Sequence, residues 1–268
     1  MGVHLKFSPA ELALAEAVSD FTLKVASPII WHDTTAGWPR RIYGGTCFFL
    51  RFASGIIGVT ANHVMEALQN AIVRNRKTIC QIRTSRPVDL PGLVIDRCSE
   101  RDIATFRVSN ELVEAIGATY LDCRSDWPPP NSLEGRAVTF CGFPEAERAT
   151  AEPGAVTLFA CGGLAIIDAV TERDLIVTYD PVRDVEAPWA PWKKPLGYNM
   201  SGCSGGPVVS HGVRNGLQRW FAIAMIISGP KDKGTGEAEG WEMITMRRID
   251  AIQPDGTIKH ADSGWLPR

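Results

Sequence analysis

The stretch that decides the fold reads Tyr198-Asn199-Met200-Ser201-Gly202-Cys203-Ser204-Gly205-Gly206-Pro207 and runs directly into the apolar pair Val208-Val209. The glycines around Ser204 allow positive φ angles and leave no Cβ between its hydroxyl and a substrate. The N–H groups of Gly202 and Ser204 can then point together toward the place where a carbonyl oxygen would become an oxyanion. Ser204 is therefore a candidate nucleophile. Such a serine needs a histidine base and a carboxylate that orients the histidine.

A simple turn would also explain this stretch, because Gly, Ser and Pro are the residues of which turns are made. The segment from Gly58 to Val64 favours the catalytic interpretation, since an apolar strand there runs into a turn of small residues that ends in His63. This is the setting that a general base requires. The other histidines lie in polar or terminal segments, where we expect surface residues or turn formers: His4, His32, His211 and His260.

The third candidate is Asp102, which opens the alternating apolar run Ile103-Ala104-Thr105-Phe106. Such alternation predicts a β-strand. A carboxylate buried at the start of a strand is costly unless it accepts a hydrogen bond, and the Nδ1–H group of His63 is the natural donor.

With these three residues in order, the chain resembles the trypsin-like (chymotrypsin-fold) serine proteases, and in particular their bacterial and HtrA-like branch. The order His, Asp, Ser is that of this clan. Four segments carry the resemblance, which extends from about Ile29 to about Ile252. They are Thr60-Ala61-Asn62-His63 (Thr-Ala-Ala-His in the family), Asp102-Ile103-Ala104 (Asp-Ile-Ala), Gly202-Cys203-Ser204-Gly205-Gly206-Pro207 (Gly-Asp-Ser-Gly-Gly-Pro) and Gly44-Gly45-Thr46-Cys47-Phe48-Phe49-Leu50 (the Gly-Thr-Gly-Phe strand).

The resemblance implies an all-β fold of two six-stranded antiparallel β-barrels. His63 and Asp102 then come from the first barrel, Ser204 comes from the second, and the chemistry lies in the cleft between them. We expect an N-terminal helical segment at 1–28, the first barrel at 29–121, a proline-rich linker at 122–135, the second barrel at 136–252 and a C-terminal tail at 253–268. The capping box that begins at Ser8 predicts a helix from about Pro9 to about Asp20.

Periodicity within these segments predicts the individual elements. Strands are expected around 29–31, 46–52, 56–60, 78–83, 93–96 and 103–108 in the first barrel. In the second they are expected around 137–142, 155–159, 164–170, 175–179, 208–210, 220–227 and 241–246. Short helices are expected at 63–68 and 110–116.

As a family member, the chain would be a serine endopeptidase that acts on polypeptides with no metal or organic cofactor. His63 would be the general base, Asp102 its orienting group, and the N–H groups of Gly202 and Ser204 the oxyanion hole. The resemblance places Tyr198 at the floor of the specificity pocket, next to Asn199, and predicts an uncharged side chain before the scissile bond. The strand that ends at Ser228-Gly229 would pair with the substrate backbone.

Three departures from the family leave alternatives open. Position 198, at the floor of the specificity pocket, is Tyr where trypsin has an acid. Cys203 replaces the acid that precedes the family's serine, and Asn62 replaces an alanine beside His63, which we expect to matter little. One alternative is a catalytically silent trypsin-like domain that acts as a peptide-binding or scaffold module. The other is a thiol mechanism through Cys203, but the register of the turn favours Ser204, which directly precedes Gly205-Gly206.

Composition limits the partners and the compartment. A net charge of −2 and a pI near 6.2 do not indicate the basic surface that nucleic-acid binding requires. No segment approaches the roughly 18 apolar residues of a membrane span, and acidic residues interrupt the apolar N-terminal segment, so no signal peptide is expected.

Seven cysteines are an odd number without metal-ligand spacing, and the family's disulfide positions hold Tyr43 and Val64, which predicts a reducing cytoplasm. We expect a regulatory protein partner or a narrow specificity to restrain such an enzyme. The loop with Trp189 and Trp192 would be either a packed lid or a contact surface for such a partner.

Overall fold

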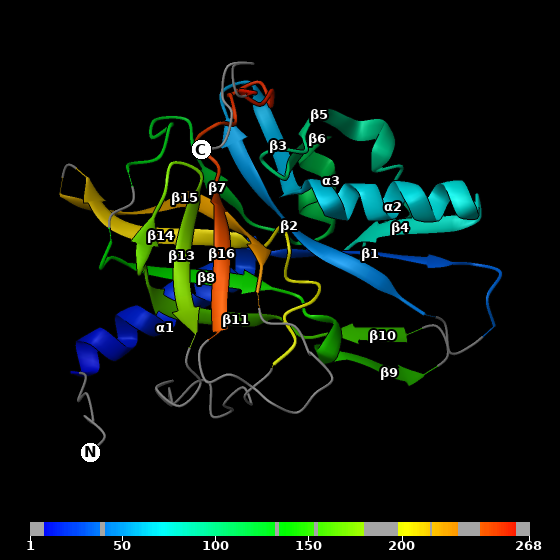
Figure 1. Ribbon diagram of the computed structural model, residues 1–268, viewed down its shortest axis with the longest axis horizontal. Helices are drawn as coiled ribbons and strands as arrows, with labels where there is room; N and C mark the ends of the chain where they lie inside the picture. The colour runs from blue at the N-terminus through cyan, green and yellow to red at the C-terminus, as the bar shows by residue number, and fades with distance from the viewer. Residues whose placement is uncertain are drawn as a thin grey trace.

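The computed structural model describes residues 8–37, 41–131, 134–152, 155–179, 198–214, 216–229 and 242–260. These residues form two seven-stranded, mainly antiparallel sheets and one separate two-stranded sheet. Figure 1 shows the first sheet, with the helices α2 and α3, beside the second sheet, with the helix α1. The protein is thus mostly β-structure with an N-terminal helix, which confirms the predicted fold class at this level.

The first sheet contains all six strands predicted between residues 29 and 121. Its backbone pairs follow the order β4-β1-β2-β3-β6-β5, and β7 adds to β2 in parallel. Within the described residues no backbone pairing joins β4 to β5, so the closed barrel stays a prediction. The strands are β1 (Ser27–Asp33), β2 (Tyr43–Phe52), β3 (Gly55–Ala61), β4 (Thr78–Ile82), β5 (Val94–Cys98), β6 (Ile103–Val108) and β7 (Tyr120–Asp122).

The core of the first sheet explains the continuous apolar run of β2. Phe48, Phe49 and Leu50 are consecutive and all fully buried, so both faces of this strand are covered. Helix α2 (Asn62–Arg74) follows β3 and buries Val64, Met65 and Leu68 on one face. It is longer than the predicted 63–68, because Ala71 and Ile72 also pack on this core. Helix α3 (Asn110–Ala115) forms where it was predicted, and a 3₁₀ turn, η1 (Pro91–Leu93), precedes β5.

The second sheet has the order β11-β8-β14-β15-β16-β13-β12. The strand predicted at 155–159 forms, but it pairs with β9 outside this sheet, so a second six-stranded barrel also stays a prediction. A 3₁₀ turn, η2 (Glu145–Glu147), leads into β9. The strands are β8 (Ala137–Gly142), β9 (Arg148–Glu152), β10 (Ala155–Leu158), β11 (Cys161–Ile166), β12 (Ala169–Val170), β13 (Asp174–Tyr179), β14 (Pro207–Arg214), β15 (Leu217–Ser228) and β16 (Glu242–Arg248).

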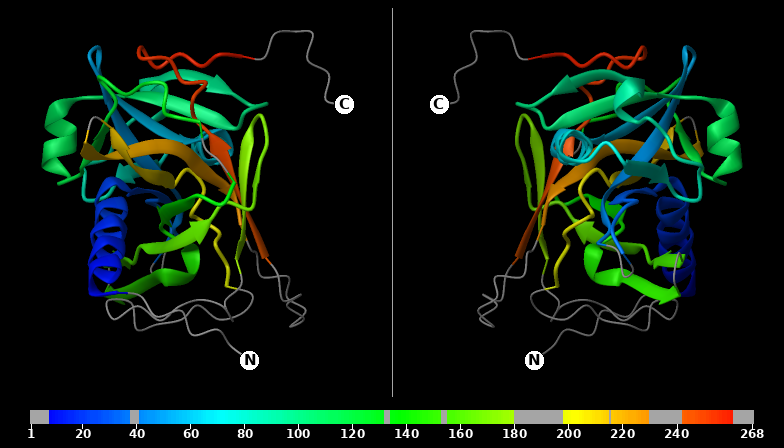
Figure 2. Two further views of the ribbon diagram at one scale, coloured as in Figure 1. Left: turned by 90° about the vertical axis from the view of Figure 1, so that its left-hand side faces the viewer. Right: turned by 90° about the vertical axis from the view of Figure 1, so that its right-hand side faces the viewer.

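Helix α1 (Pro9–Val25) extends five residues beyond its predicted end and packs on the second sheet, against β8, β11 and β14 (Figure 2). The buried Thr22 makes a 2.7 Å hydroxyl–hydroxyl contact with Thr139 of β8. Phe21 stacks on Trp220 of β15 with ring centroids 5.2 Å apart. The last turn is therefore stabilised by tertiary contacts that the local pattern does not contain.

The segments predicted as a linker and as a C-terminal tail both pack on the first sheet. In the predicted linker, the Trp127 ring packs edge-to-face on Phe52 of β2 with ring centroids 5.2 Å apart, and its indole N–H donates to the Ile252 carbonyl at 2.8 Å. In the predicted tail, the Ile258 N–H donates to Asp96 Oδ2 at 2.8 Å, and the Ile258 side chain is buried. Residues 253–260 thus cover the first sheet, as the red segment in Figure 2 shows.

The loop with Trp189 and Trp192 lies outside the described residues. Among those that the structure describes, no helix is long and apolar enough to cross a membrane.

Candidate active site

His63 and Asp102 are joined by two hydrogen bonds. Asp102 Oδ2 lies 2.8 Å from the ring Nδ1 of His63, and Asp102 Oδ1 accepts the His63 backbone N–H at 2.9 Å. Because an ionised carboxylate only accepts hydrogen bonds, it selects the tautomer with the proton on Nδ1 and leaves Nε2 as a base. This geometry is therefore consistent with the prediction that the Nδ1–H group of His63 donates to Asp102.

Backbone structure places both groups. α2 begins directly after β3, so His63 lies in its first turn with a side chain that is 47% exposed. Asp102 precedes β6 with a φ of +52°, a left-handed conformation that Asp tolerates better than most residues. The Asp102 carbonyl accepts the Asn62 N–H at 3.1 Å, which ties this turn to the start of α2.

The turn that carries Ser204 is fixed by backbone hydrogen bonds. Gly202 and Gly205 have φ angles of +98° and +85°, which a residue with a Cβ would adopt only under strain. The Gly205 N–H donates to the Ile226 carbonyl of β15 at 2.8 Å, and the Thr46 N–H donates to the Ser204 carbonyl at 2.9 Å. Strands from both sheets therefore hold the turn.

The peptide between Ser201 and Gly202 has a defined orientation. The Glu145 N–H donates to the Ser201 carbonyl at 2.6 Å. In a trans peptide the C=O and N–H groups point in opposite directions, so the Gly202 N–H points away from Glu145. In the part of the chain that the structure describes, neither the Gly202 N–H nor the Ser204 N–H donates a hydrogen bond. Both are available to an incoming oxygen atom, which is the property that an oxyanion hole needs.

Thr46 supports this turn from the first sheet. Its hydroxyl donates to the Gly202 carbonyl at 2.8 Å and accepts the Phe143 N–H at 3.0 Å. Thr46 is fully buried. This role was not predicted from the sequence, because Thr46 and Gly202 are 156 positions apart and only the Gly-Thr motif of β2 marks the site.

One pocket of about 420 Å³ brings the candidates together. His63, Gly202 and Ser204 line it, and so do the predicted substrate-binding residues Ser228 and Gly229 at the end of β15. No hydrogen bond within the described residues joins Ser204 Oγ to His63, and such contacts are often looser when no substrate is bound. The other lining residues are Trp31, Tyr43, Gly44, Val64, Ala67, Glu145, Met200, Ser201 and Ile227.

Tyr198 and Asn199 do not line this pocket. The Tyr198 hydroxyl donates to Glu147 Oε1 at 2.9 Å, and burial raises the pKa of this phenol above its usual value. Asn199 Oδ1 accepts the Ser201 N–H at 2.8 Å. Their direct roles in substrate binding stay predictions, whereas their contacts shape the neighbouring turn.

Asn62 has a larger structural role than its sequence position suggested. It is buried, its Oδ1 accepts from Arg97 Nε at 2.7 Å, and its Nδ2 donates to Glu66 Oε1 at 2.8 Å. The bond to Arg97 connects the first turn of α2 to β5, and the bond to Glu66 lies within α2. The signal for this contact was Asn62 itself, which stands where the family has an alanine.

Cys203 is fully buried beneath the turn and does not line the pocket. None of the seven cysteines forms a disulfide. Within the described residues, no group of three or more His, Cys, Asp or Glu side chains is placed to hold a metal ion. Among the groups that line this pocket are the Ser204 hydroxyl, the oriented His63 imidazole and the Gly202 and Ser204 backbone N–H donors.

Comparison with known proteins adds no assignment to this geometry. No family model matches the sequence, and no curated protein matches it at a significant level.

Proposed function

We propose that the protein is a serine endopeptidase that hydrolyses peptide bonds through an acyl-enzyme intermediate. The observation that carries the proposal is the double contact of Asp102 with His63 beside a pocket that also contains Ser204. An arrangement of this kind supplies a nucleophile, a base of fixed tautomer and an oxyanion hole within one cavity.

The mechanism follows from the positions of these groups. His63 Nε2 takes the Ser204 proton as Oγ attacks the peptide carbonyl, and Asp102 stabilises the imidazolium that forms. The Gly202 and Ser204 N–H groups bind the oxygen of the tetrahedral intermediate, and each such donor contributes about 3 to 4 kcal/mol in serine proteases. His63 then gives its proton to the leaving amine, and a water molecule that is activated in the same way releases the acyl group.

The shape of the pocket favours cleavage within a chain. Its lining extends from Ser204 onto the first sheet, at Trp31 and Tyr43, and onto the second, at Met200 and Ile227. Substrate residues on both sides of the scissile bond can therefore contact the protein. On the acyl side, Ser228-Gly229 would pair with the substrate backbone. The described lining residues Met200, Ile227 and Gly229 carry no charge, which supports an uncharged side chain before the scissile bond.

The proposal includes the finer architecture and the compartment. The two sheets would correspond to the two six-stranded barrels of the trypsin-like fold, with the pocket between them. The seven buried thiols favour a reducing environment and hence the cytoplasm. There a regulatory protein partner or a narrow specificity would restrain the enzyme.

Cleavage of an unstructured protein such as casein tests the proposal. Ser204→Ala should lose cleavage, because the nucleophile is gone. Cys203→Ala should retain most of it, because this thiol lies beneath the turn. If Ser204→Ala is active and Cys203→Ala is inactive, the nucleophile is the Cys203 thiol and not the Ser204 hydroxyl. If the wild-type protein binds unstructured peptides without cleaving them, the alternative of a silent peptide-binding module is correct.

A further inference from the structure

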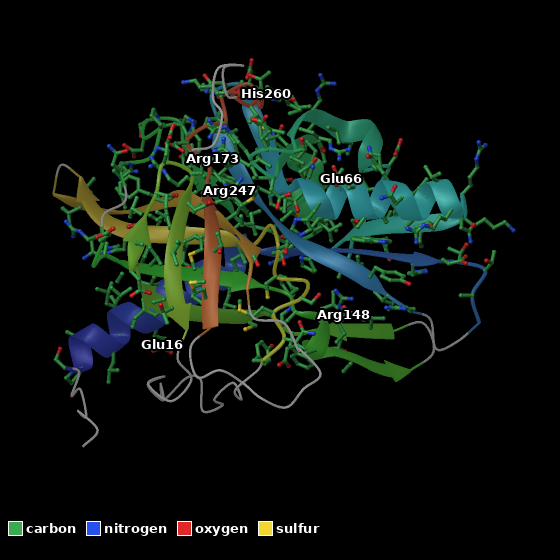
Figure 3. The ribbon with its side chains drawn as sticks, in the orientation of Figure 1. Glu16, Glu66, Arg148, Arg173, Arg247 and His260 are labelled. Atoms are coloured by element: carbon green, nitrogen blue, oxygen red, sulfur yellow. The ribbon has the colours of Figure 1, made fainter. Side chains whose placement is uncertain are left out.

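Arg148, the first residue of β9, places a largely buried guanidinium group next to Gly202, in the turn that carries Ser204. Figure 3 labels Arg148 in the fold. Its side chain is only 11% exposed. The Nη2 atom lies 3.2 Å from the position that a Cβ on Gly202 would occupy, and 3.0 Å from the corresponding position on Gly44. The two glycines thus leave space for this group between β2 and the turn.

The hydrogen bonds of Arg148 leave part of its guanidinium unpaired. Nη1 donates to the Ile42 carbonyl at 2.7 Å and lies 3.7 Å from Glu145 Oε1. Nε is buried and has no hydrogen-bond partner among the described residues. Burial lowers the pKa of Arg148, yet a guanidinium keeps its charge in proteins. A buried cation with an unpaired N–H group is costly, so a compensating role is expected.

We propose that Arg148 is a positioning residue whose buried positive charge acts through the Gly202 peptide to stabilise the oxyanion. This inference rests on the proposed serine-peptidase function. Charge develops on the substrate oxygen only as the tetrahedral intermediate forms, so a fixed cation behind Gly202 favours that state over bound substrate. Its effect is strengthened because the group is shielded from water.

Glu145 does not cancel this charge. Its side chain is 49% exposed, so water screens its carboxylate, whereas the guanidinium is largely buried. The Glu145 backbone N–H, which holds the Ser201 carbonyl, also keeps the Gly202 N–H directed away from Glu145. Arg148 and the Glu145 turn therefore act on the same peptide, one through charge and the other through orientation.

Two variants separate charge from shape. Arg148→Gln removes the charge, and Arg148→Lys keeps it but loses the planar fork. If the charge stabilises the intermediate, Arg148→Gln should lower kcat by about 10- to 100-fold and change KM by less than about threefold. The kcat of Arg148→Lys should stay within about fivefold of the wild-type value. Affinity for a peptide boronate, whose adduct with the serine is tetrahedral and anionic, should fall in parallel with kcat.

Arg124→Gln is the matched control. Arg124 is 53% exposed, pairs with Asp122 and lies outside the pocket, so its loss should leave kcat unchanged. The inference is overturned if Arg148→Gln keeps wild-type kcat, if its loss is entirely in KM, or if Arg148→Lys loses as much as Arg148→Gln. Should Arg148→Gln fail to fold, Arg148→Lys decides alone, and a loss of kcat beyond about fivefold rejects the role of charge. A wild-type protein without any cleavage would instead reject the proposed function itself.

Discussion

Asp102 holds His63 by two separate contacts, one to the ring and one to the backbone N–H. The backbone contact fixes the carboxylate even when the exposed ring turns. Nearly half of the His63 side chain is open to solvent, whereas 22% of the Asp102 side chain is. The orientation of the base therefore depends on Asp102 more than on packing around the imidazole.

Asp102→Asn should lower kcat by about 10⁴-fold, as in related triads. The amide oxygen can still accept the His63 backbone N–H. The amide NH₂ group then faces ring Nδ1, so the ring proton moves to Nε2 and the base is lost. Steady-state kinetics gives the rate, and thermal unfolding shows whether the fold survives. A folded variant that retains more than about a tenth of wild-type kcat would contradict the assigned role.

At the scale of elements, the site depends on the tie between β2 and the turn that carries Ser204. Thr46 links the Gly202 carbonyl and the Phe143 N–H through one hydroxyl. The Thr46 backbone N–H holds the Ser204 carbonyl as well. β2 thus supports the predicted oxyanion hole, although it belongs to the other sheet.

Thr46→Val should weaken the fold by about 1 to 3 kcal/mol, because it leaves the buried Phe143 N–H without an acceptor. It should also lower kcat, since the Gly202 carbonyl loses its donor. Thr46→Ser keeps the hydroxyl and is the matched control. Urea denaturation and kinetics of the three proteins check the prediction, and equal behaviour of the Val and Ser variants would show that the hydroxyl has no such role.

Sequence patterns identified the elements of the site more readily than the contacts that hold them. The strands of the first sheet, α1 and the residues His63, Asp102 and Ser204 follow from periodicity and from short motifs. The last turn of α1 was missed because Thr22 is stabilised by Thr139, which lies 117 positions away. Arg148 and Thr46 were missed for the same reason, since their partners are brought near only by the folded sheets.

At the scale of the whole molecule, the pocket lies where the two sheets meet, and cysteines are distributed through both. All seven are buried and free of disulfides. Burial raises the pKa of Cys80 and Cys123 to about 12. These thiols therefore remain protonated in the folded protein at pH values where they ionise in the unfolded chain.

Stability should consequently fall as the pH rises above about 9, the ordinary value for a thiol. Below that pH both states keep the proton, so the thiols add no pH dependence. Between about 9 and 12 only the unfolded state releases it, which favours unfolding. Urea denaturation from pH 7 to 10 measures this, with Cys80→Ala as the variant whose stability should fall less steeply. An unchanged slope in that variant would contradict the assignment.

The most direct test of the serine mechanism is covalent labelling by a fluorophosphonate probe, followed by mass spectrometry of the digested protein. Such probes react much faster with a serine that a neighbouring base and an oxyanion hole activate than with an ordinary hydroxyl. We predict one adduct, on Ser204, that forms in the presence of reductant and is lost in His63→Ala. A folded wild-type protein that takes up no probe, or an adduct on another residue, would contradict the central claim.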